Sequence, residues 1–579
     1  MDRDDLFGPL REAIEAGAAQ ALGSLYGLEG PFHYKFETPP DPAMGHLALA
    51  CFPFAKAAKT GPPIIAQALA QALGSINGLA EARAVGPYLN FFLSPRYLAD
   101  RLLTSALMPD FGNSSQGKGQ RLLLEYSSPN TNKPLHLGHG RNNLLGMALA
   151  SLSETQGFEV IKVNLVNDRG IHICKSMLAY QTFGQSETPE SSGLKGDKLV
   201  GKYYVEYDKR SKLDPRLEDQ AAQMLRDWEA EVPEVRSLWR TMNDWVLAGF
   251  QETYDRLGCQ FDQLYFESET YQSGREIVLK AQAEGRVEVE DNGALSIDLT
   301  DIGLDKKILL RGDGTSMYIT QDLGTTVKKY ADFYFDHHFF VVGNEQDYHF
   351  KVLFEVLKRF GYDWAARLEH LSYGMITLPE GKMKSREGTV VDLDDLLDEM
   401  KALAQTEIES REIFGPKEQD LIGATAEWVG QGAVKYFILK SGAAREMQFN
   451  PKESLSFDGQ TGPYLQYTHA RISSLAKRAQ EVELGSKEGY AWSGQETELL
   501  VQLGRFYELL QFCFSERNPA PLCTYLYELA RNYNKYYYDQ PVLKAEPNER
   551  RARLDLGLAV QAVLAKGLKI LGIEPLKRM

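Results

Sequence analysis

Residues 128–141 of this 579-residue chain read SPNTNKPLHLGHGR. An apolar, strand-like run, 121–126, precedes them, and a helix-like run, 142–154, follows them. Two imidazoles, His136 and His139, therefore lie where a strand passes into a helix. In an open α/β sheet phosphates bind at such a point, because a helix N-terminus offers free N–H groups and a partial positive charge. The segment predicts a nucleotide site whose imidazoles donate hydrogen bonds to phosphate.

A pair of histidines three residues apart also has two simpler interpretations. A zinc site would need further ligands, and no cysteine pair lies nearby in the sequence. Two unrelated surface histidines would be the default interpretation if this segment stood alone. The rest of the chain favours the nucleotide site.

Apolar, strand-like runs alternate with helical stretches between about 119 and 455, which predicts parallel βαβ units. The clearest runs are 121–126, 160–166, 337–342 and 368–376. A charged, tryptophan-containing, helix-like stretch at 186–254 interrupts this pattern, and we interpret it as an insertion into the sheet domain.

Polar clusters follow all four of these runs. They are SPN and HLGH (128–130 and 136–139), NDRG (167–170), GNEQDYH (343–349) and GKMKSREG (381–388). Because the carboxyl ends of parallel strands meet at one edge of a sheet, the four clusters are expected to form one ligand site. The glycine-flanked basic loop 381–388 has the composition of a mobile phosphate clamp, although a solvated basic turn has the same composition.

The two ends of the chain have different patterns. Block 1–118 mixes helix-like stretches at 6–22 and 62–73 with a strand-like run at 89–93, which predicts an α+β domain. After about 456 the sequence reads as helices only, at 464–482, 496–515, 520–539 and 548–571.

Charge is unevenly distributed along the chain. The whole chain has a net charge of −15, but residues 461–579 contain 16 basic and 13 acidic residues. The C-terminal segment is thus the better candidate for contact with a polyanion, with ordinary solvated helix faces as an equal alternative on charge alone.

Composition also limits the compartment. The five cysteines are scattered and odd in number, which favours a reducing cytoplasm over a disulfide framework. The acidic start, MDRDD, argues against a secretory signal, and no apolar run is long enough to span a bilayer. A cytoplasmic protein with no membrane partner is expected.

The polar clusters resemble the signatures of a known family. HLGH (136–139) resembles the HIGH signature of class I aminoacyl-tRNA synthetases, and KMKSR (382–386) resembles their KMSKS signature. Nearly the whole chain resembles the arginyl-tRNA synthetases of this class. The segments that carry this resemblance are EYSSPN (125–130), YITQD (318–322), QDYH (346–349), GPYLNFFL (86–93), YLQYTHAR (464–471) and the terminal KRM (577–579).

This resemblance implies a fold, an activity and partners. It implies a Rossmann-like catalytic domain at 119–455, an added tRNA-contacting α+β domain at 1–118 and an all-α anticodon-binding domain at 456–579. The implied enzyme uses ATP, with Mg²⁺, to join L-arginine to its tRNA through an arginyl-adenylate. A monomer without a protein-bound metal is expected, and members of the family typically need bound tRNA before they activate arginine.

The resemblance assigns ATP contacts to His136, Gly138 and His139, and His139 also contacts the amino acid. Here the chain departs from the family pattern, because the fourth position of the second signature is Ser385 rather than lysine. Some members with a similar gap carry a lysine just before the HIGH signature.

Lys133 occupies that place in this chain. Our hypothesis is that Lys133 supplies the missing positive charge to the ATP phosphates. Lys382 and Lys384 would assist from the loop at 381–388.

The arginine side chain is a planar cation with five donors, so its pocket needs acceptors at fixed angles. Asp322 can pair with a guanidinium bidentately, and Tyr318 would lie on the same face if this segment is helical. The resemblance adds contacts to the amino, carboxylate or guanidinium groups from Ser128, Asn130 and Gln346, and a second carboxylate from Glu125.

Two other functions fit part of the pattern. Another class I aminoacyl-tRNA synthetase would share both signatures but not the pocket of Asp322 and Gln346. A non-catalytic tRNA-binding relative could lose the histidines and keep the helical end. The tRNA bases that are read stay open, because the tyrosines at 533 and 536–538 could stack on bases or belong to the core.

Overall fold

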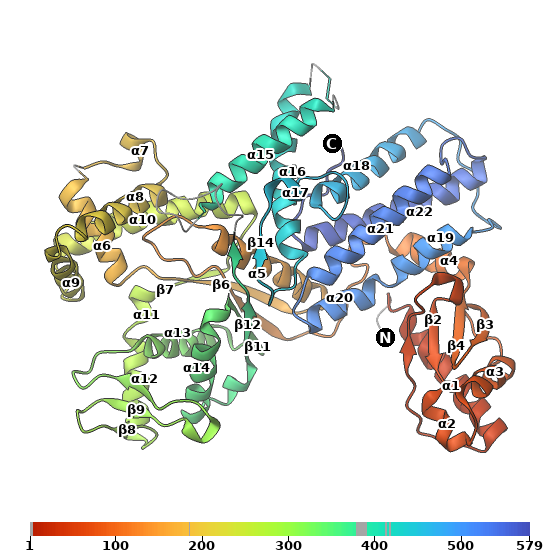
Figure 1. Cartoon of the computed structure of the whole chain (residues 1–579), viewed down its shortest axis with the longest axis horizontal. Helices are drawn as coiled ribbons and strands as arrows, with labels where there is room; N and C mark the ends of the chain where they lie inside the picture. The colour runs from red at the N-terminus through yellow and green to blue at the C-terminus, as the bar shows by residue number, and fades with distance from the viewer. Residues whose placement is uncertain (1–3, 185, 378–390, 412–413, 416–417) are drawn as a thin grey trace.

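The computed structural model of the chain describes residues 4–184, 186–377, 391–411, 414–415 and 418–579. Figure 1 shows a mixed N-terminal unit, a central sheet with helices on both faces, and a set of C-terminal helices. The N-terminal unit lies beside the C-terminal helices. Arg505 joins these two parts by donating to Thr38 Oγ1 at 2.6 Å and to the carbonyl of His46 at 2.7 Å.

The N-terminal unit is an antiparallel sheet of order β1-β2-β4-β3 covered by helices. Its core is formed by buried residues such as Ile14, Phe54, Leu69 and Phe91. The α+β prediction is confirmed, with helices and a strand close to the expected ranges. The elements are α1 (Phe7–Tyr26), β1 (Phe36–Glu37), β2 (Leu47–Ala50), α2 (Phe52–Ala58), α3 (Pro62–Ala72), β3 (Leu79–Val85), β4 (Tyr88–Leu93) and α4 (Pro95–Ser105).

Five parallel strands form the central sheet, in the order β12-β11-β5-β6-β7. They are β5 (Arg121–Glu125), β6 (Glu159–Val166), β7 (Gln263–Phe266), β11 (His337–Gly343) and β12 (Leu368–Tyr373). The chain winds from β5 toward β7 on one side and toward β12 on the other. The winding therefore reverses between β5 and β11, and ligands bind at the carboxyl ends of the strands beside such a reversal.

Both faces of this sheet are buried, which explains why its strands read as continuous apolar runs. Leu122 and Leu124 of β5 pack in the cluster that contains α5 (Leu137–Thr155). Leu123 points to the other face, where it joins the cluster of α13 (Tyr318–Phe333) and α14 (Asp347–Arg359). Helix α6 (Ile171–Phe183) follows β6.

Four helices occupy the range in which an insertion was expected. They are α7 (Pro189–Ser192), α8 (Gly196–Ser211), α9 (Arg216–Glu229) and α10 (Pro233–Leu257). Strand β7 and a small antiparallel sheet after it were not predicted, because their strands are short and, apart from the buried β9, partly exposed. The additional elements are α11 (Glu267–Thr270), α12 (Ser273–Ala283), β8 (Glu288–Val289), β9 (Leu295–Ile297) and β10 (Lys307–Leu310).

Two predicted elements are divided in the structure. The run 368–376 splits at Gly374, because the chain there passes against Arg445, whose carbonyl carbon would lie 2.7 Å from an added Cβ. The residues after Gly374 form β13 (Ile376–Thr377), which pairs with β14 (Met447–Gln448). The expected helix 496–515 is interrupted at Arg505.

The C-terminal part is helical, as predicted, among the residues described after 456. Its helices and those leading to it are α15 (Leu393–Ser410), α16 (Gln419–Leu439), α17 (Pro451–Ser454), α18 (Gly462–Ala479), α19 (Gly494–Gly504), α20 (Phe506–Ser515), α21 (Ala520–Asp539) and α22 (Pro547–Ile570). Short 3₁₀ turns are η1 (Pro42–Met44), η2 (Thr300–Ile302), η3 (Asn344–Gln346) and η4 (Asp363–Arg367).

The five cysteines are free and buried. In the described part of the chain, no helix combines the length and the apolar character needed to cross a bilayer.

Candidate active site

The turn between β5 and α5 is organised by its own two histidines. Helix α5 begins at Leu137, earlier than predicted, because His136 is its N-cap. His136 Nδ1 accepts from the backbone N–H groups of Gly138 (3.1 Å) and His139 (3.4 Å), and His139 Nδ1 accepts from the N–H of His136 (3.2 Å). Because both Nδ1 atoms accept, a neutral ring at either position carries its proton on Nε2.

This capping corrects the expectation that the helix N-terminus offers free N–H groups to phosphate. The N–H of Leu137 donates to the carbonyl of Val391 at 2.9 Å, and that of Gly140 donates to the carbonyl of His136. With the two N–H groups bound by His136 Nδ1, the first turn is already satisfied within the protein. The donors that remain for a nucleotide are the imidazole Nε2–H groups.

Electrostatics keep these imidazoles neutral. Burial lowers the pKa of His136 to about 4, with Lys133 adding to the effect. Burial also lowers the pKa of His139 well below its usual value. At neutral pH both rings are therefore uncharged donors. Lys133 lies close enough for its charge to act on His136, His139 and His172, and its own pKa is lowered by burial.

Two positions of this motif require glycine for steric reasons. A Cβ on Gly138 would lie 2.9 Å from His136 Cε1, so the ring of the capping histidine needs the space. A Cβ on Gly140 would lie 2.9 Å from Leu393 Cδ1, so this glycine admits the first turn of α15. The contact of Gly138 with a nucleotide stays a prediction.

The backbone after β5 is held in an unusual conformation. Ser127 and Ser128 both have positive φ, 79° and 46°. Three amide side chains hold this turn, because Asn142 and Asn164 accept from the two serine N–H groups and Asn167 donates to the carbonyl of Ser128. Such strain persists only where neighbours impose it, and it is typical of functional sites.

A cavity of about 730 Å³ lies at the carboxyl ends of β5, β6 and β11. It gathers predicted residues from segments far apart in the sequence, since its lining includes Glu125, Ser128, Asn130, Tyr318, Asp322 and Gln346. His172 also lines the cavity, and the charge of Lys133 acts on it. The lining does not include Lys133, His136, Gly138 or His139, so the loop between β5 and α5 borders the cavity through Ser128 and Asn130.

Asp322 faces this cavity from α13. The helix puts Tyr318 and Asp322 one turn apart, as predicted. Asp322 Oδ2 is 2.6 Å from His349 Nε2, and the Asp322 side chain remains 35% exposed. The carboxylate can thus accept further hydrogen bonds from a ligand.

Glu125 differs from its predicted role as an acceptor. Its carboxylate is paired with Lys329 of α13, and His338 Nε2 lies 3.8 Å away. Burial alone would raise the pKa of Glu125, but Lys329 and His338 hold that pKa below its usual range. The predicted acceptor already has a cation within the protein, and the pair ties α13 to β5.

Glu267 is a carboxylate of the cavity that sequence reasoning missed. It begins α11, directly after the unpredicted strand β7, and lines the cavity. Burial raises the pKa of Glu267 to about 7, with Asp168 and Asp322 adding to the rise, while Arg169 opposes it from 4.0 Å. Recognising QLYF (263–266) as a strand would have identified Glu267 as a residue at the ligand-binding edge.

The remaining predictions concern the basic loop and a protein-bound metal. Lys382, Lys384 and the loop 381–388 lie outside the described residues. Among the residues that are described, no group of three or more His, Cys, Asp or Glu side chains could hold a metal ion.

The C-terminal tyrosines fall into two classes. Tyr533 and Tyr536 are buried in the core and cannot stack on a base. Tyr538 is 88% exposed and lines a cavity of about 580 Å³ between α18 and α21. Tyr537 shares this lining with the basic side chains Arg471, Arg478 and Lys544.

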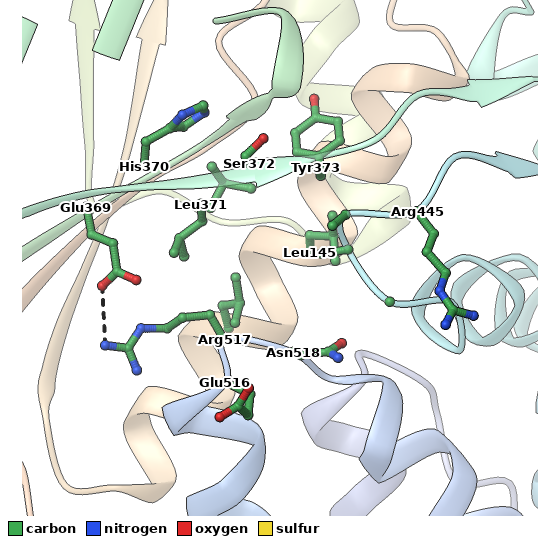
Figure 2. A pocket seen from close by; sticks show the side chains of 15 residues that line it. Leu145, Glu369, His370, Leu371, Ser372, Tyr373, Arg445, Glu516, Arg517 and Asn518 are labelled. Carbon is green, nitrogen blue, oxygen red and sulfur yellow. Dashed lines mark hydrogen bonds and ion pairs between the residues drawn. The ribbon is translucent and has the colours of Figure 1, made fainter. Parts of the chain in front are cut away.

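A further cavity, of about 390 Å³, lies between β12, the segment 442–445 and the turn 516–518 (Figure 2). Glu369 of β12 and Arg517 form an ion pair of 3.3 Å beside it. None of the predicted site residues lines it. We interpret it as a packing gap where the sheet edge meets the C-terminal helices.

Comparison with known proteins covers nearly the whole chain. Residues 102–450 match the family "tRNA synthetases class I (R), catalytic domain", residues 465–579 match "DALR anticodon binding domain", and residues 10–93 match "Arginyl tRNA synthetase N terminal domain".

Individual relatives agree with the family matches. An arginine–tRNA ligase of Treponema denticola is 46% identical over 557 residues, covering 93% of this chain and 94% of the relative. One of Treponema pallidum subsp. pallidum is 44% identical over 592 residues, covering 99% and 100%. The solved arginyl-tRNA synthetase of Thermus thermophilus superposes with a TM-score of 0.79 at 28% identity, covering 98% of this chain and 100% of that one.

Proposed function

Since the chain belongs to the class I arginyl-tRNA synthetases, it joins L-arginine to its tRNA at the expense of ATP, and we propose which of its residues perform the two steps. In the first step the arginine carboxylate attacks the α-phosphate of ATP and pyrophosphate leaves. In the second step the arginyl group moves from the adenylate to the terminal ribose of the tRNA. Both steps depend on positioning and on stabilising charge on phosphate, with little covalent work for the protein.

His136 and His139 bind the ATP phosphates through their Nε2–H groups. Both Nδ1 atoms accept backbone hydrogen bonds, which fixes the orientation of the rings before ATP arrives. Preorganised donors of this kind cost no reorganisation when charge develops on the α-phosphate. Because the two rings are neutral, Lys133 contributes the positive charge from this side of the site, and Lys382 and Lys384 add to it.

Asp322 and Glu267 together bind the guanidinium. Two carboxylates that line one cavity can accept from both edges of a planar fork, which a single acceptor cannot do. Glu125 does not bind the guanidinium directly. Its pair with Lys329 holds the helix that carries Asp322. Ser128, Asn130 and Gln346 contact the amino and carboxylate groups, and Tyr318, which also lines the cavity, completes the pocket.

Mg²⁺ enters with the nucleotide in this proposal. Mg²⁺ is usually held by one or two carboxylates together with substrate phosphates, so the ATP phosphates would supply most of its ligands. When bound, Mg²⁺ neutralises charge on the phosphates and on the departing pyrophosphate.

The cavity around Tyr538 binds anticodon bases of the tRNA. It combines an exposed aromatic ring with Arg471, Arg478 and Lys544, and unpaired bases are recognised by stacking on aromatic rings beside positive charge. The N-terminal domain contacts another part of the same tRNA. We further propose a monomer that acts in the cytoplasm.

The observation that carries the site assignment is the cavity itself, which brings Asp322, Ser128 and Gln346 together from three segments of the chain. The test is charging of total tRNA with each of the twenty amino acids, with ATP and Mg²⁺, by the wild type and by His136→Ala. We expect charging with arginine alone, and a loss of activation in the variant. Unchanged ATP kinetics in His136→Ala would overturn the ATP assignment.

A further inference from the structure

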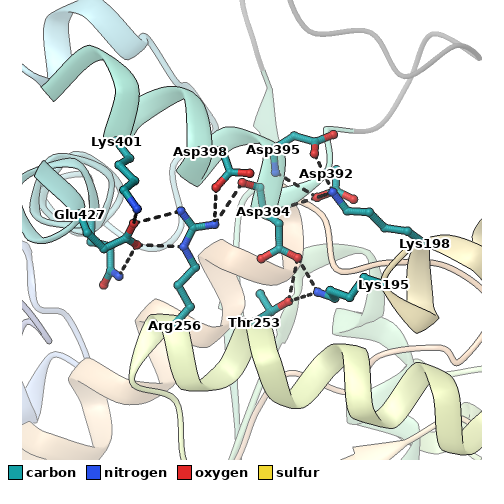
Figure 3. A network of polar contacts seen from close by, with 11 residues as sticks. Lys195, Lys198, Thr253, Arg256, Asp392, Asp394, Asp395, Asp398, Lys401 and Glu427 are labelled. Carbon is teal, nitrogen blue, oxygen red and sulfur yellow. Dashed lines mark hydrogen bonds and ion pairs between the residues drawn. The ribbon is translucent and has the colours of Figure 1, made fainter. Parts of the chain in front are cut away.

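Helix α8 of the insertion contacts the loop that leads into α5. A Cβ on Gly201 of α8 would lie 2.8 Å from Pro134 Cδ and 3.5 Å from Lys133 Cα, so the helix backbone passes directly over this loop. The N-terminal end of α8 carries two lysines, Lys195 and Lys198, that face α15 (Figure 3). The helix therefore touches the loop just before the first signature, and its N-terminal lysines reach the start of α15.

Lys195 is the centre of a largely buried ionic joint. Its Nζ lies 2.5 Å from Asp394 Oδ2 of α15, 2.6 Å from Thr253 Oγ1 of α10 and 3.2 Å from Asp197 Oδ2. The Lys195, Asp394 and Asp197 side chains are 13%, 15% and 0% exposed. A pair at this depth is sensitive to the loss of one partner, because the other charge is then left without compensation.

Lys198 reaches the same turn of α15. Its Nζ is 2.6 Å from Asp395 Oδ1 and 3.6 Å from Asp392 Oδ1. Asp392 is the N-cap of α15 and accepts from the N–H groups of Asp394 and Asp395. The lysines of α8 thus hold the first turn of α15 at its cap and at Asp394.

This turn of α15 is bonded in turn to the first turn of α5. The N–H of Leu393 donates to the carbonyl of Leu135 at 3.0 Å, and the N–H of Leu137 donates to the carbonyl of Val391 at 2.9 Å. The Leu393 side chain also fills the space that Gly140 leaves. A shift of α15 would therefore move both neighbours of His136 in the chain.

We propose that Lys195 is a positioning residue for adenylate formation, which holds Asp394 so that the α15 turn keeps His136 and His139 aimed at ATP. The inference rests on the proposed ATP role of these histidines. The route runs from Lys195 to Asp394, along the α15 turn to Leu393, and through the backbone bond at Leu135 to the capping histidine. A displacement of a catalytic group by a fraction of an ångström is enough to slow a reaction that depends on alignment.

The test compares four variants of the full-length chain with the wild type. Lys195→Met breaks the joint, and Lys195→Arg retains its charge. Lys202→Met is the matched control, because Lys202 lies on the same helix and pairs at 2.6 Å with Glu187, within the insertion. Asp394→Asn is the second test of the joint, because it leaves the Lys195–Asp197 pair intact. It replaces Lys195→Met as the test variant if Lys195→Met does not fold.

The measurements are arginine- and tRNA-dependent ATP–pyrophosphate exchange and thermal unfolding. We expect Lys195→Met and Asp394→Asn to lower kcat/KM for ATP by about tenfold or more, with KM for arginine changed by less than about twofold. Lys195→Arg should recover most of the loss, and Lys202→Met should match the wild type.

Two results would overturn the inference. One is a lower unfolding temperature with kinetic constants unchanged well below that temperature, which would make the joint purely structural. The other is an equal loss for ATP and arginine. His136→Ala, measured in parallel, separates the proposed ATP role of the histidines from the positioning role of Lys195. If His136→Ala impairs ATP kinetics and Lys195→Met does not, only the role of Lys195 fails. If His136→Ala has no effect, the ATP role of the signature fails, and the inference fails with it.

Discussion

Replacing Asp322 with asparagine removes one charge from the guanidinium pocket with little change in shape. The carboxylate is 35% exposed, lines the cavity and accepts from His349, a hydrogen bond that an asparagine oxygen can still accept. The substitution therefore removes mainly the charge-assisted bond to substrate, which is worth about 1.5–3 kcal/mol. Partial exposure screens the charge, so we take about 1.5–2 kcal/mol, which corresponds to roughly 10- to 30-fold in kcat/KM for arginine.

The assay is steady-state charging of tRNA with arginine, with ATP varied in a separate series. KM for ATP should change by less than about twofold, because the proposed contact of Asp322 is with the amino acid and not with the nucleotide. Asp332→Asn is the matched control. Asp332 lies on the same helix, is 36% exposed, and accepts from Lys328 and Tyr265 instead of facing the cavity. If the two variants lost the same activity, or if Asp322→Asn lost less than about twofold, the assignment of Asp322 to the guanidinium would be wrong.

Three further predictions address the other parts of the site. Lys133→Ala should slow arginine activation by well over twofold, where twofold corresponds to about 0.4 kcal/mol, because no charge replaces Lys133 beside the neutral imidazoles. ATP–pyrophosphate exchange with tRNA present measures this effect. Because burial raises the pKa of Glu267 to about 7 and the arginine cation favours its ionised form, kcat/KM for arginine should rise as the pH rises through about 7. A pH profile of Glu267→Gln should lack this rise, and a retained rise would assign it to another group. Tyr538→Ala should raise KM for tRNA about fivefold or more without changing thermal stability. The buried Tyr533 is the contrast, because Tyr533→Ala should lower the unfolding temperature. A normal KM for Tyr538→Ala would exclude stacking at that position.

The central sheet could be predicted because its strands are buried on both faces. Leu122, Leu123 and Leu124 show no alternation, since they pack alternately against α5 and against the helices of the other face. Of the strands that were missed, β9 is buried but only three residues long, and β7 and β8 lack this signal. In β7 only Tyr265 is fully buried, and both residues of β8 are exposed.

The site could be predicted as a set of residues but not as a set of contacts. Parallel topology alone brings the polar clusters after β5, β6 and β11 to one edge, so their convergence follows from the order of the segments. The pairing of Glu125 with Lys329 spans 204 positions in the chain, and the pattern around either residue does not reveal it. The capping by His136 depends on its extended backbone conformation, with φ −114° and ψ 173°, which only the folded structure reveals.

Charge is divided between the two adjoining parts of the site. On the proposed nucleotide side, the buried imidazoles are neutral, directional donors, and the positive charge beside them is that of Lys133. On the proposed amino-acid side, Lys329 neutralises Glu125, which is why we assign the guanidinium to Asp322 and Glu267. A lysine side chain presents a point charge that cannot satisfy both acceptors at their fixed angles, and a neutral side chain leaves both without a counter-charge. If this assignment holds, a wrong substrate leaves Asp322 and Glu267 without their partner, so binding itself discriminates against it.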